Sequence, residues 1–529
     1  TGIDDAGAGF FKGLGQGDHF VPGAAIVHQV EHGYAKNDDK VGSCFFAHGA
    51  QKIFGVWGLA IFTFSFLVNV NTTPQLATFG LASIVIFLLA IGLFLTPTAM
   101  AATEMGTTWP RTGGIYIWTR MAFGEPAGFM IIWLEWANFV VAWPGIMGTL
   151  TLEAAFIVDP ELNNNPLFLV STVILVTWIA AGMALRGLKV ARGFAWYSVV
   201  VGTVIPVIIL VGFAIASLVG GTPPAMDASP SAIFSGFDAT NIAFISGALL
   251  MFSGIEISAI HAADIQNPAR TIPRSNLIAV ALCFILLVPL TMSIAILVPS
   301  KDIDIVTGLL QSAQTIFDRF DVGWLLPVFG FCVVTGLATA LVQIINGPSR
   351  GLVVAGRQGG NLPPALQREN SNKMPVVIIL LQATISSILS LGYFFLGSVQ
   401  NAWFMFALIQ TNMTLIMYLI MFASVIKLRY SRPNVNRPYQ IPGKKVGLWA
   451  ITGIGMLVCI VGVLVSFQPT DEAAGMSTPV YITILLIGTV AFVAMPFIFW
   501  IFRKPSWKTE VAPDPDQPDP EALDAAAAA

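Results

Sequence analysis

Charged residues are scarce in this sequence. Of its 529 residues, 55% are hydrophobic and only 10% are Asp, Glu, Lys or Arg. Soluble globular domains carry about 25% charged residues. The scarcity therefore excludes an ordinary soluble protein and predicts a polytopic membrane protein. The net charge of −3 adds little, because in a membrane protein the positions of the charges matter more than their sum.

Cysteine and histidine are also rare, and neither is spaced as a binding motif. The four cysteines show no paired spacing, and Cys283, Cys332 and Cys459 lie inside apolar runs, as small core residues do. Four of the five histidines precede residue 50 at spacings that match no zinc pattern. We therefore expect no metal site and no cofactor, and the sequence indicates no nucleic-acid partner.

The two ends of the chain lack long apolar runs. Residues 1–52 are Gly-rich and mixed in charge, and they show no signal-peptide pattern, so we expect a cytoplasmic N-terminal tail. Residues 505–529 are rich in Pro, Asp and Ala. Such a composition buries too little apolar surface to fold, which predicts a disordered C-terminal tail.

Between the tails lie twelve hydrophobic segments near the roughly 20-residue length that spans a bilayer. Their approximate bounds are 54–78, 81–105, 127–157, 167–185, 194–219, 241–261, 277–298, 324–345, 376–396, 403–428, 448–467 and 480–502. Of the 26 Lys and Arg residues, only Lys301 and Arg319 fall outside when both termini are placed in the cytoplasm. Because cytoplasmic loops carry the basic excess, this pattern predicts a multi-pass protein of the cell inner (plasma) membrane with both termini cytoplasmic.

The sixth segment contains a carboxylate beside a helix breaker. Its central stretch reads LLMFSGIEISAIHAADIQNPARTIPR from residue 249. An ionisable group at membrane depth costs about 2.5–3.5 kcal/mol and is kept mostly where it faces a pathway or a partner. The candidate substrate-binding residues here are Ser253, Gly254, Ile255 and Glu256, and Glu256 is also a candidate for coupling.

The first segment is broken in a matching way. Pro74 removes a helical hydrogen bond, and the freed carbonyl groups need another partner in lipid. The candidate substrate-binding residues before it are Asn69, Val70, Asn71 and Thr72. Paired broken helices in two halves are typical of transporters with inverted repeats and a midplane site. The alternative is that Pro74 and Gly254 merely kink packed helices.

The spacing of the two breaks predicts the repeat boundaries. The second break lies five segments after the first. This spacing gives a first five-helix repeat in residues 53–220 and a second in 221–430, with helices 11 and 12 appended in 431–504. An odd number of spans per repeat forces the two repeats into opposite orientations. Unpaired amides can hold a substrate carboxylate and unpaired carbonyls an ammonium group, an arrangement that suits a zwitterion.

The third segment carries a second carboxylate, Glu135, in the stretch IIWLEWANFVVAWPG. It is a candidate proton carrier or a determinant for a cationic substrate. The alternative is a carboxylate that is hydrogen-bonded to a neighbouring helix or that lies near the cytoplasmic interface. Trp136 is a candidate gate, with core packing as its alternative.

Several motifs resemble the amino acid-polyamine-organocation superfamily, and within it the bacterial glutamate/GABA antiporter branch. They are GIEISAIHAADIQNPARTIP from Gly254, INGPSRGLVVAGRQGGNLPPAL from Ile345, AATEM from Ala101 and RPYQIPG from Arg437. The resemblance implies an all-α, LeuT-like fold of 5+5 inverted repeats plus two extra helices. It also implies alternating access and a substrate site between segments 1, 3, 6, 8 and 10.

The resemblance adds residues to the candidate site. Glu256 matches the family's segment-6 carboxylate, and Asn138 matches a polar position in segment 3. Gln343 stands in the region where the family has an aromatic residue in segment 8, and it becomes a gating candidate. The acidic C-terminal tail does not match the long basic plug of the glutamate/GABA exchangers.

These observations favour a secondary antiporter that exchanges an amino acid for a related amino acid or its decarboxylated amine. A proton-coupled symporter and a non-transporting amino acid sensor remain as alternatives. The expected partners are a small amino acid or amine, protons and the lipid bilayer. An enzyme is not expected, because the membrane region contains no His-rich motif and no GxSG serine.

Overall fold

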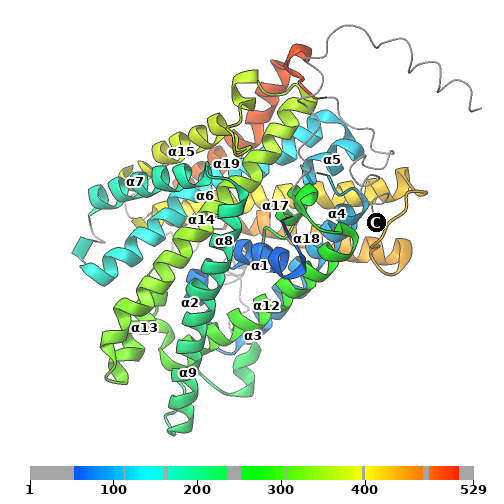
Figure 1. Cartoon of the computed structure of the whole chain (residues 1–529). Coiled ribbons are helices and arrows are strands. Elements are labelled where there is room, and N and C mark those ends of the chain that lie inside the picture. The colour runs from blue at the N-terminus through cyan, green and yellow to red at the C-terminus, as the bar shows by residue number, and fades with distance from the viewer. Residues whose placement is uncertain are drawn as a thin grey trace, which may run out of the picture. The chain divides into compact units, whose positions relative to one another are not determined.

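The computed structural model describes residues 53–68, 70–111, 113–159, 161–162, 165–234, 252–304, 307–395, 399–468 and 476–510. The described residues form helices joined by turns, with isolated β-bridges at Phe54 and Glu369. The long helices cross one another in a bundle (Figure 1). The expected N-terminal tail, residues 1–52, lies outside the described residues.

The helices and helical turns follow one another along the chain with these bounds: α1 Val56–Leu67, η1 Val70–Thr72, α2 Thr73–Ala77, α3 Ala82–Ala90, η2 Ile91–Leu95, α4 Thr96–Thr108, α5 Ile115–Phe123, α6 Glu125–Val158, α7 Pro166–Ala184, α8 Leu188–Val199, η4 Val200–Val204, α9 Ile205–Val219, η5 Pro230–Phe234, α11 Ile257–Ile260, η6 Ala262–Asp264, α12 Pro268–Leu297, η7 Ser300–Asp302, α13 Gly308–Arg319, η8 Gly323–Leu325, α14 Leu326–Gly359, η9 Pro364–Gln367, α15 Val376–Ser390, α16 Gly392–Phe395, α17 Val399–Ser431, α18 Lys444–Ser466, α19 Thr478–Ile501 and η11 Pro505–Trp507.

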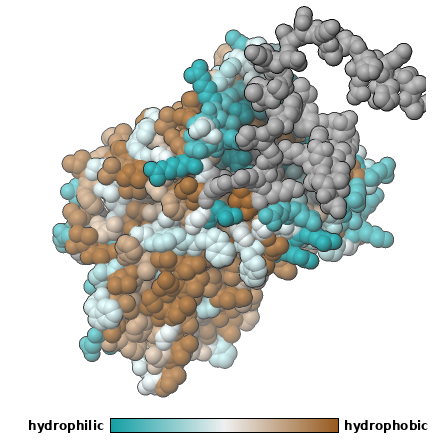
Figure 2. Space-filling model, in the orientation of Figure 1, coloured by the Kyte–Doolittle hydropathy of each residue, from teal (hydrophilic) through white to brown (hydrophobic). Residues whose placement is uncertain are grey.

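Eleven helical segments among the described residues are long and apolar enough to cross a bilayer. Figure 2 shows a broad apolar surface on the face in view, with hydrophilic residues gathered toward one end. The prediction of an all-α polytopic membrane protein is therefore confirmed. Of the remaining predicted span, 241–261, residues 241–251 lie outside the described residues.

Two of the spanning helices contain a π-helical turn just before a proline. η2 precedes Pro97 in the second segment, and η4 precedes Pro206 in the fifth. Proline lacks the N–H that closes a helical turn, and its ring clashes with the preceding turn. A wider turn accommodates the ring while the surrounding backbone stays helical, which lets each helix cross the bilayer without a break.

Contacts at the helix ends bring distant segments together at one end of the bundle. Arg192, at the start of the fifth segment, donates from Nη1 to the carbonyl of Ile53 at the start of the first, over 2.6 Å. Asn370, before the ninth segment, donates from Nδ2 to the carbonyl of Leu185 at the end of the fourth, over 2.8 Å. We call this end, where Arg-rich loops gather, the basic end.

The six residues 505–510, after the last spanning helix, contact the end of the eighth segment and the turn that follows it. Residues 505–510 contain η11, and the Thr509 amide donates to the carbonyl of Arg357 over 3.1 Å. The Nε2 of Gln367 donates to the carbonyl of Trp507 over 2.9 Å. Residues 505–510 therefore contact the end of α14 and η9, and the disordered tail stays a prediction. Residues 511–529 lie outside the described residues.

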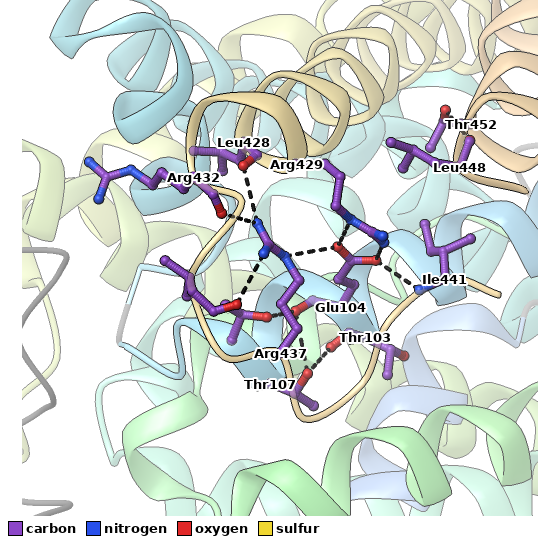
Figure 3. Close-up of polar contacts among 12 residues, drawn as sticks. Thr103, Glu104, Thr107, Leu428, Arg429, Arg432, Arg437, Ile441, Leu448 and Thr452 are labelled. Atoms are coloured by element: carbon purple, nitrogen blue, oxygen red, sulfur yellow. Dashed lines mark hydrogen bonds and ion pairs between the residues drawn. The ribbon is translucent and has the colours of Figure 1, made fainter. Parts of the chain in front are cut away.

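A buried carboxylate joins three parts of the chain at the basic end. Glu104, near the end of α4, is fully buried and forms a two-point ion pair with Arg429 at the end of α17. Its Oε1 lies 3.3 Å from Nε of Arg437, and its Oε2 accepts from the amide of Ile441 over 2.8 Å. Figure 3 shows the carboxylate pointing between the two guanidinium groups. The α17–α18 connection is thereby fixed to the second segment.

The fifth and eighth segments touch through their backbones. A Cβ added to Gly336 of α14 would lie 2.2 Å from Cα of Gly202 in η4, and the reverse addition leaves 2.5 Å. Only glycine permits this approach, since the obstructing atoms belong to backbone and cannot move aside. Small residues at helix crossings are a common basis of packing in membranes.

Glu104→Gln is expected to destabilise the protein by about 3–5 kcal/mol, because it leaves two buried guanidinium groups without their counter-charge. Thermal unfolding of the detergent-purified protein measures the effect. Glu510→Gln is the matched control, since it removes an exposed ion pair with Arg357 and should leave the melting temperature almost unchanged. Equal melting temperatures for the two variants would contradict this role of Glu104.

Gly202→Val is expected to force the fifth and eighth segments apart at a cost of about 1–3 kcal/mol or more. Gly212→Val is the control in the same segment, because a Cβ at Gly212 meets no atom within 4 Å. Only Gly202→Val should lower the melting temperature and give a less uniform size-exclusion profile. A Gly202→Val protein as stable as the control would show that the crossing can relax.

Candidate functional site

The described part of the sixth segment is non-helical around Gly254. This residue has φ +112°, a conformation that side chains bearing a Cβ rarely adopt, and the described residues 252–256 are not helical before α11 begins at Ile257. Ile255 and Glu256 are buried in the unwound turn, and Ser253 is partly buried. Non-helical backbone therefore lies where the sequence predicted a break, and the positive φ of Gly254 requires a glycine there.

Tyr418 of α17 braces the unwound turn. Its hydroxyl accepts from the amide of Gly254 over 2.7 Å and donates to Oε2 of Glu256 over 2.6 Å. One hydroxyl thus satisfies a freed backbone group and fixes the orientation of the carboxylate. Sequence reasoning missed Tyr418, although a tyrosine within an apolar segment signals a hydroxyl that needs a partner.

The first segment breaks after α1. Val68 is extended, and the chain continues as η1 and then α2, which carries Pro74 in its first turn. Thr73 donates its hydroxyl to the carbonyl of Val70 over 2.6 Å and so satisfies a group that the break exposes. Val70 and Asn71 are buried and Thr72 is partly buried, whereas Asn69 lies outside the described residues.

The broken segments lie against each other. A Cβ on Gly254 would be 3.5 Å from Cβ of Phe66, so the turn at Gly254 packs on the last turn of α1, just before the break in the first segment. Toward the basic end, the amides of Ile53 and Phe54 both donate to the carbonyl of Asp264, over 2.8 and 3.1 Å. The structure therefore brings together the two segments that the sequence paired.

A polar cluster joins the sixth and eighth segments at their basic ends. Nη1 of Arg350 lies 3.1 Å from Oδ2 of Asp264 and 3.1 Å from Nδ1 of His261. The His261 ring is fully buried and packs edge-to-face with Phe62 of α1, with ring centroids 5.5 Å apart. The carbonyl of Asp264 also accepts hydrogen bonds from the amides of Ile53 and Phe54, just before α1. This cluster therefore connects segments 1, 6 and 8.

The third segment, α6, supplies three of the predicted side chains. Glu135, Trp136 and Asn138 are all buried. The Nδ2 of Asn138 donates to the carbonyl of Glu135 over 3.1 Å, and Trp136 packs on Trp133 with ring centroids 5.1 Å apart. Glu135 has no exposed surface, so its carboxylate lies inside the helix bundle.

Two further polar residues lie inside the bundle. Glu153, near the other end of α6, is fully buried and its carboxylate interacts with the Asn71 side chain in the first break. Asn346 of α14 is fully buried, and its amide has no hydrogen-bond partner among the described residues. Gln343, the residue predicted in segment 8, lies on the same helix, and its side chain is outside the described part. Glu153 and Asn346 were missed because their burial depends on helix orientation.

The described residues contain no group of three His, Cys, Asp or Glu side chains that could hold a metal ion. The candidate site therefore offers freed backbone groups, carboxylates and amides. These are the groups that bind small zwitterions and amines.

Tyr418→Phe is expected to speed hydrogen exchange in the peptide 252–260 by about tenfold or more, because the amide of Gly254 loses its acceptor. Mass spectrometry of the purified protein measures the exchange. Tyr481→Phe is the matched control, since it removes another buried hydroxyl, which donates to the carbonyl of Ser466. Unchanged exchange in the Tyr418 variant would refute the bracing role.

Comparison with known proteins places the chain among transporters. The family model described as amino acid permease matches residues 54–492. A glutamate/gamma-aminobutyrate antiporter of Lactococcus lactis is 32% identical over 461 residues, which cover 85% of this chain and 90% of that protein.

Two other relatives cover similar lengths. An uncharacterized transporter of Legionella pneumophila is 30% identical over 456 residues, which cover 86% of this chain and 97% of that protein. A probable agmatine/putrescine antiporter of Lactococcus lactis is 22% identical over 431 residues, covering 80% and 90%. With matches that span its membrane region, the chain belongs to the amino acid permease family of the amino acid-polyamine-organocation superfamily.

Proposed function

We propose that this protein is a secondary antiporter that exchanges an amino acid for a related amino acid or its decarboxylated amine by alternating access. The observation that carries the proposal is the pair of broken segments in contact, with Glu256 held at the break by Tyr418. The relatives named as glutamate/gamma-aminobutyrate and agmatine/putrescine antiporters support the substrate class.

The proposed site lies where segments 1, 3 and 6 meet. Freed amides near the breaks would receive the substrate carboxylate, and Glu256 would receive its ammonium group. The substrate-binding set remains the predicted one: Asn69, Val70, Asn71, Thr72, Asn138, Ser253, Gly254, Ile255 and Glu256. Because the breaks are held by side-chain hydrogen bonds, the helix pieces on either side can change their relative angle without unfolding.

The proposed location is the cell inner membrane, with both termini in the cytoplasm. The basic end of the bundle would then face inward, as the distribution of Lys and Arg favours. The cluster of Arg350, His261 and Asp264 would close the cytoplasmic side of the site by tying segments 1, 6 and 8 together. The gating candidates Trp136 and Gln343 lie on the third and eighth segments.

Counterflow in proteoliposomes tests the exchange. Liposomes loaded with unlabelled glutamate, GABA, arginine or agmatine should take up the labelled partner compound, and efflux should require substrate on the opposite side. Glu256→Gln is expected to reduce exchange by at least about tenfold, since it removes one charge-assisted contact. Efflux into substrate-free buffer would favour a symporter, and binding without transport would favour a sensor.

A further inference from the structure

Exposed lysines and aromatic residues gather where α17 ends and α18 begins. We call this surface the lysine patch, and it comprises Lys427, Tyr430, Lys444, Lys445 and Trp449. All five residues are exposed, Tyr430 by 47% and Trp449 by 53%. Because α17 and α18 are both long and apolar enough to cross a bilayer, we expect their adjoining ends to lie where the bilayer meets water.

Tyr430 connects the two helices within the patch. Its hydroxyl accepts from Nε1 of Trp449 over 3.0 Å, and Nζ of Lys445 lies 5.2 Å from the centroid of its ring. Lys445 and Trp449 are four residues apart on α18 and so share one face of that helix. Lys427 stands one turn before Tyr430 on α17 and shares its face. The patch is therefore one surface built from two segments.

The loop between the two helices is held at two points. Nη2 of Arg437 donates to the carbonyls of Leu428 and Arg432, over 3.1 and 3.0 Å. The amide of Ile441 donates to the buried carboxylate of Glu104 over 2.8 Å (Figure 3). The start of α18 thus has a fixed place beside the end of α17. A surface whose backbone is already ordered loses less entropy when it binds a ligand.

The positive charge of the patch has no counter-charge in the described chain. Residues 427–449 contain no Asp or Glu. Arg429 and Arg437 of this stretch share the carboxylate of Glu104, whereas none of the three lysines forms an ion pair among the described residues. Lysines that serve only to orient the chain need no particular surroundings. These lysines instead surround two aromatic rings that are hydrogen-bonded to each other, as a binding surface for an anion would require.

We propose that the lysine patch binds the headgroup of an anionic phospholipid in the leaflet at the basic end. The lysines contact the phosphate group, and the rings of Tyr430 and Trp449 lie at the headgroup level, where tyrosine and tryptophan collect in membranes. Val446, which is 81% exposed beside Lys445, adds apolar surface for the acyl chains. A zwitterionic headgroup brings its own cation to the lysines and binds less tightly. This inference does not depend on the proposed exchange function.

Native mass spectrometry of the detergent-purified full chain tests the proposal. Phosphatidylglycerol and phosphatidylcholine with the same acyl chains are added in equal amounts, and wild-type protein should retain mainly phosphatidylglycerol. Lys444→Gln with Lys445→Gln should lower the ratio of bound phosphatidylglycerol to phosphatidylcholine by at least about tenfold, because each lysine near an anionic headgroup contributes roughly a fivefold preference. Lys444→Arg with Lys445→Arg keeps the charge and should keep the preference.

The matched control is Lys504→Gln with Lys508→Gln. It removes the same charge from another lysine–aromatic contact, since Nζ of Lys504 lies 5.7 Å from the centroid of the Trp507 ring. The control should leave the lipid ratio almost unchanged. Equal losses in the two Gln variants would show diffuse attraction and overturn the site, as would equal retention of both lipids by the wild-type protein.

Glycerol 3-phosphate separates a lipid from a soluble anion. It carries the phosphate without acyl chains, so it should not displace phosphatidylglycerol, and displacement would overturn the assignment to a lipid. If the Gln variant of the patch fails to fold, the melting temperature of the wild-type protein decides. A larger rise with phosphatidylglycerol than with phosphatidylcholine or glycerol 3-phosphate supports the proposal, and equal rises reject it.

Discussion

Backbone hydrogen bonding inside hydrocarbon is the constraint on which the rest of this structure depends. A continuous helix satisfies its own amides and carbonyls, and any break must find other partners for them. Here each break finds a partner in a side chain: the Tyr418 hydroxyl accepts from the amide of Gly254, and the Thr73 hydroxyl donates to the carbonyl of Val70. The breaks are stable because these partners satisfy the freed backbone groups. The Tyr418 hydroxyl, which satisfies one of them, also orients Glu256.

The uninterrupted helices provide the rigid surroundings for these breaks. α6 and α14 each run for 34 residues, and α17 for 33, so they cross the whole bundle and present side chains at every depth. α6 packs against both α14 and α17. A site between broken and continuous helices has carboxylates held by continuous helices on one side. On the other side it has backbone groups that can exchange their hydrogen-bond partners. That combination suits a protein which must hold a small molecule and then release it on the opposite face.

Sequence reasoning predicted the parts of this protein that depend on composition and local chemistry. Hydrocarbon-length apolar runs located the spanning helices, and Pro74 and Gly254 located the breaks, because proline and glycine act on their own backbone. Which side chains face one another depends on helix rotation and crossing, which carry no local signal. Tyr418, Asn346 and the Glu104 cluster were therefore found only in the structure. The contacts of residues 505–510 carry no local signal for the same reason, since their partners lie in α14 and η9.

The buried ion pair of Glu104 has a consequence for the synthesis of the chain. Glu104 and Arg429 are separated by 325 residues. At about 5–20 residues per second, the ribosome needs roughly 16–65 s to make the chain between them. During that interval the second segment is already in the translocation machinery or the bilayer with a carboxylate that has no permanent partner. The depth of the second segment in the membrane is therefore not fixed until the tenth segment is inserted. The last third of the chain thus completes the insertion of the first third.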